Sequence, residues 1–220
     1  MLLRATVWAA LSTFIFTLSG NMDIAESKTT KKKSTNTIKK KAAIKGFRSA
    51  KFGMKEKDVY RAIVKDFKIS KRKVKVSVNS LEKTTNLEIA VPKLLGMGGT
   101  AKIHYLFGYK SKKLMQVNII WEAAAEGSGE NATKEDIVNT ANFLRDHFTK
   151  KQYAKEGYIA NGRVNDTTTI VFRGKDKQNR MILLVLTTPK DKNSFLLRLS
   201  YMLDFENPDI RTITIKENDF

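Results

Sequence analysis

Apolar residues recur at helical spacing between residues 55 and 69, and four lysines lie at other positions of the segment. The stripe consists of Val59, Ala62, Ile63 and Phe67. A 3.6-residue period of this kind predicts an amphipathic helix that turns its apolar stripe toward a core.

Four segments after this helix alternate apolar and polar residues, which is the pattern of half-buried strands. They span residues 74–78, 87–91, 103–107 and 115–121. The last two flank the turn Gly108–Lys113, so we expect a β-hairpin over residues 103–121.

A second helix is predicted after a linker at Ala123–Asn131. Thr133 and Asp136 form a capping-box-like start for it. Its apolar stripe is Ile137, Ala141, Leu144 and Phe148. Strand-like segments follow at residues 168–172, 181–186 and 195–203, and residues 211–215 add a short final strand.

The predicted order of helix, four strands, helix and three or four strands indicates an α+β protein with helices packed on an antiparallel sheet. We expect two halves, residues 46–125 and 126–220. Lys55-Glu-Lys-Asp-Val59 resembles Lys134-Glu-Asp-Ile-Val138, which suggests a degenerate tandem duplication.

The N-terminal residues 1–19 have the pattern of a secretory signal peptide. Arg4 precedes an apolar stretch over residues 5–18, and the small residues Thr17 and Ser19 suit a cleavage site. An uncleaved signal that anchors the chain in a membrane is the alternative. Residues 20–45 are rich in lysine and poor in large apolar side chains, so we predict a disordered linker.

Charge and cysteine content narrow the location and the chemistry. The chain of 220 residues has a formal net charge of +19. Residues 26–45 hold eight Lys and one Glu, or +7, and residues 46–220 hold 32 basic and 20 acidic residues, or +12. The chain has no Cys, which excludes a thiol nucleophile, a disulfide, a Cys-ligated zinc and a lipoprotein lipid anchor. A secreted chain without cysteine suits a Gram-negative periplasm.

The segment Phe47–Val59 carries a local motif in which Gly53-Met54 precedes the acidic first turn of the predicted helix. It resembles the helix opening of the outer-membrane assembly lipoprotein family SmpA/OmlA, and it is similar to the repeats of the β-lactamase inhibitor protein family. It also resembles exported proteins of alphaproteobacteria. The resemblance implies an exported module that binds proteins through a sheet face. Lys55 departs from the usual Ser or Thr of this motif.

Candidate catalytic residues are few. His104 falls on a predicted strand and His147 near the end of the second predicted helix, with no patterned carboxylates beside them. Such an arrangement matches neither a metal site nor a catalytic triad. We therefore predict no catalytic, metal-binding or cofactor-binding residue, and no enzyme.

Basic residues form the most pronounced candidate surface for an anionic partner. They are Lys68, Lys71, Arg72, Lys73, Lys75, Lys110, Lys112 and Lys113. Tyr105, Phe107 and Tyr109 alternate close by, an arrangement that nucleic-acid modules use for base stacking. The export signal, however, favours an anionic envelope component, namely a lipid, lipopolysaccharide or an acidic protein.

The sequence thus predicts a non-enzymatic, periplasmic or secreted binding or envelope-assembly module that acts through a basic surface. Two alternatives remain. One is a small exported hydrolase or hydrolase inhibitor that uses His104 or a carboxylate, and the other is an exported nucleic-acid binder. The sequence leaves the oligomeric state open.

Overall fold

The computed structural model describes residues 39–123, 132–188 and 195–212. Within them, two α-helices accompany an eight-stranded antiparallel sheet, so the predicted α+β class is confirmed. The elements are β1 (Gly46–Phe47), β2 (Ala50–Lys51), α1 (Glu56–Phe67), the short 3-10 helix η1 (Lys71–Lys73), β3 (Lys75–Val78), β4 (Thr85–Val91), β5 (Ala101–Phe107), β6 (Leu114–Glu122), α2 (Lys134–Thr149), β7 (Ile159–Asn165), β8 (Thr168–Lys175), β9 (Met181–Thr187) and β10 (Leu196–Met202).

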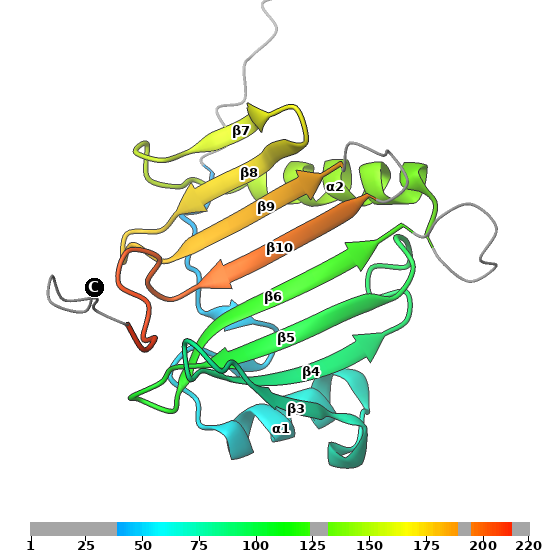
Figure 1. Ribbon diagram of the computed structural model, residues 1–220. Coiled ribbons are helices and arrows are strands. Elements are labelled where there is room, and N and C mark those ends of the chain that lie inside the picture. Colours follow the sequence, from blue (N-terminus) through cyan, green and yellow to red (C-terminus); the bar gives the residue numbers. More distant parts are fainter. Residues whose placement is uncertain (1–38, 124–131, 189–194, 213–220) are drawn as a thin grey trace, which may run out of the picture. The chain divides into compact units, whose positions relative to one another are not determined.

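The sheet consists of two four-stranded meanders that meet at their last strands. Its strand order is β3-β4-β5-β6-β10-β9-β8-β7, and every neighbouring pair is antiparallel (Figure 1). The β6–β10 pair joins the halves through seven residue pairs, from Leu196 opposite Glu122 to Met202 opposite Gln116. Each half therefore contains one α-helix followed by four consecutive strands.

One face of the sheet carries the core. The register places Ile103, Ile119, Leu199 and Leu184 side by side on four adjacent strands, and all four are buried. Because successive residues of a strand point to opposite faces, this row defines the helix-covered face. The predicted stripes of α1 and α2 supply buried residues to the same core, as expected.

Aromatic rings connect the two helices beneath the sheet. Phe67 of α1 stacks on Phe47 with a centroid distance of 6.4 Å, and Phe47 lies 5.6 Å from the ring of Tyr201 in β10. Tyr201 in turn lies 6.4 Å from Phe148 of α2, which stacks on Phe172 of β8. Aromatic contacts of this kind stabilise a core beyond their buried area, so the two halves share one core.

The helix starts differ in the way their motifs suggest. Thr133 caps α2 through the predicted capping box, in which its side chain accepts from the Asp136 amide. Lys55 precedes α1 and provides no side-chain cap, as its departure from the Ser or Thr of the motif implies. Acidic residues in the first turn of α1 still favour that helix end electrostatically.

The strands differ from the prediction in three places. Strand β7 was not predicted, because it is an edge strand whose residues are mostly exposed and do not alternate in polarity. The predicted strand at 211–215 is absent at residues 211 and 212, and its remaining residues lie outside the described ranges. The hairpin of β1 and β2 before α1 was also not predicted.

The predicted boundary of the N-terminal linker at residue 45 is too late. The backbone amide of Ala42 donates to the Gln152 carbonyl at 2.8 Å, and Ile44 is buried at 3% exposure. A single large apolar residue in a lysine-rich stretch carries too little signal for a sequence pattern to place it in the core. The predicted signal peptide and residues 20–38 of the linker lie outside the described ranges.

Candidate functional site

The face of the sheet opposite the helices is lined by a mixture of polar and apolar side chains. The register aligns Glu88, His104, Asn118, Ser200 and Leu183 across five strands from β4 to β9. These residues neighbour the buried core row along each strand and so point the opposite way. We call this surface the helix-free face; it faces the viewer in Figure 1, with α2 behind the strands.

A first hollow of about 360 Å³ lies on the helix-free face. Its walls come from the β3–β4 hairpin and from strands β5, β6 and β10. They are formed by Ser77, Val78, Asn79, Thr84, Asn86, His104, Leu106, Asn118, Ile120 and Arg198. Most of these side chains offer hydrogen-bonding groups, so the hollow suits a polar rather than an aliphatic ligand.

Amide side chains order the floor of this hollow. The Asn86 side-chain nitrogen donates to Ser77 Oγ at 3.3 Å and lies 3.3 Å from His104 Nδ1. Gln116 Nε2 donates to Asn118 Oδ1 at 2.8 Å. Asn86 Oδ1 is buried and finds no partner among the described residues. The floor therefore retains hydrogen-bonding capacity that the fold does not use.

A second hollow of about 320 Å³ adjoins the first, and the two share Leu106 and Arg198. The chain that follows β10 forms its outer wall with Asp204, Phe205, Pro208 and Ile210. Strand residues such as Gln116 and Ser200 line its floor. Together the two hollows extend across the sheet from the β3–β4 hairpin to β9.

Arg198 stands out in the charge pattern of the helix-free face. Lys75 pairs with Glu88 at 3.7 Å and Lys102 with Glu122 at 3.8 Å. Arg198 is exposed at the junction of the two hollows, and no carboxylate of the described residues lies within 4 Å of its guanidinium. A planar, unpaired guanidinium is suited to bind a carboxylate in bidentate fashion.

His104 has the character of a neutral hydrogen-bonding group. Desolvation lowers its pKa, against the opposing effect of Glu88, whose carboxylate oxygen lies 3.9 Å from Nδ1. Asn86 is its nearest side-chain partner, and an amide cannot act as a nucleophile. His147 lies on α2, on the other side of the sheet, so the two histidines do not share a site. Among the described residues, no hydroxyl group forms a hydrogen bond with the His104 ring, so the hydrolase alternative gains no support from this position.

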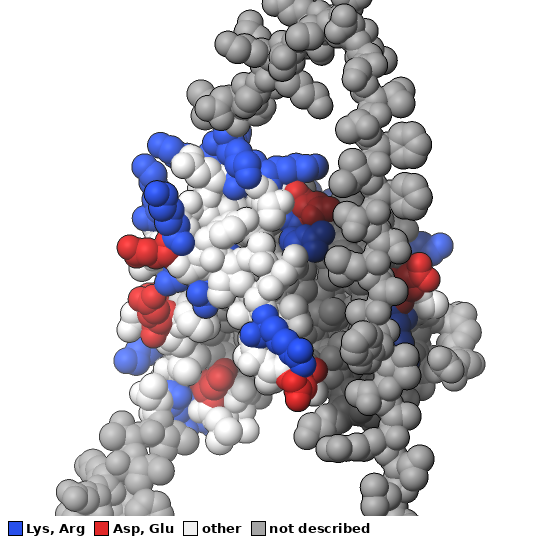
Figure 2. All heavy atoms as spheres, turned by 90° about the horizontal axis from the view of Figure 1, so that it is seen from above, with Lys and Arg blue, Asp and Glu red and all other residues white. Residues whose placement is uncertain are grey.

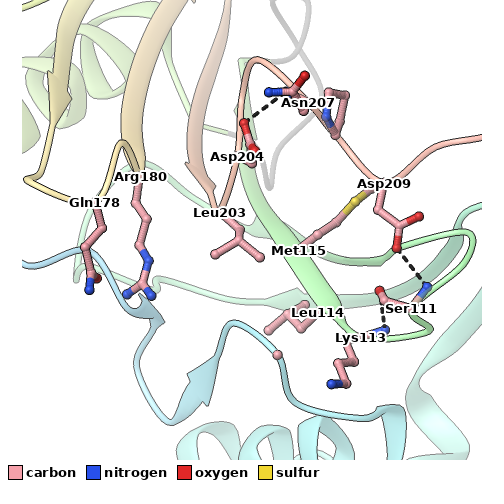
Figure 3. Close-up of a pocket in the computed structure, with 12 residues that line it drawn as sticks. Ser111, Lys113, Leu114, Met115, Gln178, Arg180, Leu203, Asp204, Asn207 and Asp209 are labelled. Carbon is pink, nitrogen blue, oxygen red and sulfur yellow. Dashed lines mark hydrogen bonds between the residues drawn. The ribbon is translucent and has the colours of Figure 1, made fainter.

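A third cavity of about 540 Å³ lies at the end of the sheet where β6 begins and β10 ends (Figure 3). Three of its four charged side chains, all but that of Lys113, already serve the fold. Arg180 donates to the Ile44 carbonyl at 3.2 Å, and Asp209 accepts from the amides of Lys110 and Ser111. Asp204 accepts from the amides of Glu206 and Asn207 in its own turn. This cavity therefore offers little free binding capacity.

The predicted basic residues are all exposed, but they form two groups. Lys68 ends α1, Lys71–Lys73 form η1 and Lys75 begins β3. Lys110, Lys112 and Lys113 lie in the β5–β6 turn, which meets the start of α1 through the bridge between Lys55 and Lys113. The 12 residues of α1 separate the groups by about 18 Å.

Basic side chains also occur elsewhere on the surface. Figure 2, which looks down on the molecule from the top of Figure 1, shows Lys and Arg along the upper rim and also at separate places over the rest of this view, interspersed with acidic side chains. The positive charge is therefore spread over several surfaces, and it does not by itself mark one site.

The aromatic stripe that suggested nucleic-acid stacking faces the core. Tyr105 and Phe107 are buried at 1% and 2% exposure, under the helices, and only Tyr109 is partly accessible. A base cannot stack on a ring that the core already covers, so this argument for a nucleic-acid partner is wrong. Alternation in a strand does not tell whether its aromatic side chains face the core or the solvent, so the sequence could not distinguish core packing from an exposed stacking surface.

Among the residues that the structure describes, no three His, Asp or Glu side chains gather as a metal-binding cluster. Neither of the two helices is long and apolar enough to cross a membrane. Comparison of the chain with protein-family models, with curated proteins and with solved structures found no match.

Proposed function

We propose that this protein is a non-enzymatic, exported binding module that recognises an acidic segment of a partner protein on its helix-free face. The observation that carries the proposal is Arg198, an exposed cation without a carboxylate partner in the described chain, where two hydrogen-bonding hollows meet. One face of the sheet is committed to the core, whereas the other retains unused polar groups.

An acidic protein segment suits this face better than a lipid surface does. Membrane attachment relies on several basic residues that approach the headgroups together, each contributing about 1 kcal/mol. Among the described residues, the two hollows are lined by one cation, Arg198, together with amides, a histidine, apolar side chains and the carboxylates of Glu82 and Asp204. The two lysine groups beside α1 are the elements that would contact an anionic membrane instead.

Site-specific photocrosslinking in the native cell tests the proposal. A benzophenone amino acid at Leu106, which lines both hollows, reports on the helix-free face. The same probe at Phe143, which is 49% exposed on α2, is the matched control on the other face. We expect a discrete crosslinked protein from position 106 that is absent at 143 and reduced about tenfold by Arg198→Glu.

The control charge reversal is Lys102→Glu, because Lys102 already has Glu122 as a partner and lies outside both hollows. It should leave the crosslink intact. Equal crosslinking from both positions, or a crosslink that Arg198→Glu does not weaken, would contradict the proposal. Cosedimentation with anionic but not neutral vesicles, lost on reversing the lysines of η1, would favour a membrane surface instead.

We further infer that the two halves arose by duplication. In support, each half is an α-helix followed by a four-stranded meander, and the strand order is symmetric about the β6–β10 pair. The similar residues at the two helix starts agree with this inference. The resemblance to β-lactamase inhibitor proteins, which also bind through a sheet face, remains part of the proposal.

Export to the periplasm is likewise a proposal, supported by the signal-peptide pattern of residues 1–19. Cell fractionation and N-terminal sequencing of the mature protein test it. A new N-terminus near residue 20 in the periplasmic fraction is expected, and an intact N-terminus in the cytosol would contradict it.

A further inference from the structure

Strand β3 leaves one edge of the sheet open. It spans Lys75–Val78, pairs with β4 alone among the described strands, and all four of its residues are exposed. Val76 is 55% and Val78 61% exposed, so two apolar side chains stand at the margin of the sheet. An edge of this kind presents unpaired backbone groups on which another strand can form.

The pairing pattern shows which backbone groups point outward. The Asn79 amide donates to the Thr84 carbonyl at 2.9 Å, so Asn79 and Thr84 form a hydrogen-bonded pair. Such pairs alternate with non-hydrogen-bonded pairs in an antiparallel ladder. Val78 opposite Thr85 and Val76 opposite Leu87 are therefore non-hydrogen-bonded pairs. Both valines direct their N–H and C=O groups away from β4.

The opposite edge, β7, is protected by irregular backbone. Asn161 has a positive φ of 59°, and the register with β8 shifts between Arg163 and Asn165. Bulges and kinks of this type prevent an incoming strand from pairing. Strand β3 pairs with β4 in continuous register and lacks these features. The two edges of the same sheet are thus built differently.

The basic residues before β3 determine which kind of segment can pair with this strand. Lys71, Arg72 and Lys73 precede the strand, are exposed, and have no carboxylate of the described residues within 4 Å. Lys75 pairs with Glu88. A second copy of the chain has the same net charge of +19, which repels it from these lysines. An acidic segment with alternating apolar residues would complement both the lysines and the valines.

We propose that β3 accepts an extended segment of a partner polypeptide, with alternating acidic and apolar residues, as an added strand of the sheet. Main-chain hydrogen bonds to Val76 and Val78 would supply affinity, and the lysines before the strand would supply selectivity for acidic residues. The inference does not require Arg198: Val78 also lines the first hollow, but the strand addition rests on the outward backbone groups of β3.

A synthetic peptide of four Glu-Val repeats is the probe, with four Lys-Val repeats as the charge-reversed control, and fluorescence anisotropy measures binding to the purified protein. We expect only the acidic peptide to bind. Replacing Val76 and Val78 together by proline removes two outward N–H groups and no ladder bond to β4, so the affinity should fall about tenfold with the thermal midpoint nearly unchanged. Replacing both by alanine keeps the N–H groups and should weaken binding less.

Three results would overturn the proposal. The first is equal binding of the two peptides, and the second is unchanged peptide binding by a double-proline variant that still folds. The third is a concentration-dependent dimer of the wild-type protein that the double-proline variant does not form, because this would assign the edge to a second copy. Ser77→Pro should disrupt the β3–β4 pairing. This variant is therefore the control that shows how structural damage to the edge affects peptide binding. Lys102→Glu, which lies outside both hollows, should leave peptide binding unchanged, and because the peptide assay does not measure the crosslink from position 106, the two proposals can fail separately.

Discussion

The backbone amide of Ile44 donates a hydrogen bond of 2.8 Å to the carboxylate of Asp176, although 132 residues separate them in the chain. Asp176 is buried at 5% exposure in the β8–β9 turn, where it also accepts from the amides of Gln178 and Arg180. Arg180 returns a bond to the Ile44 carbonyl. The first part of the described chain is therefore fixed to the second half.

We expect Asp176→Ala to lower the free energy of unfolding by about 3 kcal/mol. The substitution leaves three backbone amides without their acceptor, and hydrogen bonds to charged groups are individually strong. Asp176→Asn retains one oxygen and should cost less. Urea denaturation measures both. A loss below about 1 kcal/mol for the alanine variant would show that water replaces the carboxylate easily.

The helices and the core strands could be predicted because their apolar residues follow a period of 3.6 or 2. Trp121 and Ile119 are buried as the alternation in their strand indicates. The contact of Ile44 with Asp176 could not be predicted, since no local pattern relates residues so distant in sequence. Strand β7 escaped prediction because an edge strand needs no buried alternation.

The candidate site was harder to predict than the fold. Arg198 alternates with apolar residues and so indicates an outward side chain, but the sequence does not place it between two hollows. Those hollows arise only when β10 pairs with β6 and the following chain crosses the helix-free face. The lysines are conspicuous in the sequence, yet α1 holds their two groups apart.

Stability should fall as the pH is lowered below about 6.5. Burial lowers the pKa of His104, and desolvation together with nearby lysines lowers that of His147. The unfolded chain therefore binds more protons than the folded protein in this range, so protonation favours unfolding. The stabilising contribution is complete above the unfolded pKa and is lost as the pH falls through the folded pKa.

Denaturant titrations between pH 7.5 and 5 measure this effect. His104→Gln should reduce the slope of stability against pH, because glutamine keeps hydrogen-bonding groups but does not titrate. An identical slope for wild type and variant would mean that His104 titrates as it does in the unfolded chain.

Asp209 ties the chain after β10 to the β5–β6 turn. Its carboxylate accepts from the amides of Lys110 at 2.9 Å and Ser111 at 2.8 Å, and its carbonyl accepts from the Tyr109 amide. Hydrogen bonds from Ser111 and Lys110 lower the pKa of Asp209. Asp209→Ala should therefore speed hydrogen exchange of the amides at 110 and 111 about tenfold. Unchanged exchange would show that the turn keeps these amides protected unaided.

The hydroxyl of Tyr153 is buried without a hydrogen-bond partner among the described residues, and desolvation raises its pKa above the ordinary tyrosine value. Its ring packs on Phe172 at a centroid distance of 5.1 Å and fills the space beside Gly174 in β8. Tyr153→Phe keeps these contacts and removes the unpaired hydroxyl, so the free energy of unfolding should rise by about 1 kcal/mol. Tyr153→Ala, which also removes the ring, should lower it by about 3 kcal/mol. A phenylalanine variant less stable than wild type, measured by urea denaturation, would show instead that the hydroxyl binds an ordered water, because only a satisfied group loses stability on deletion.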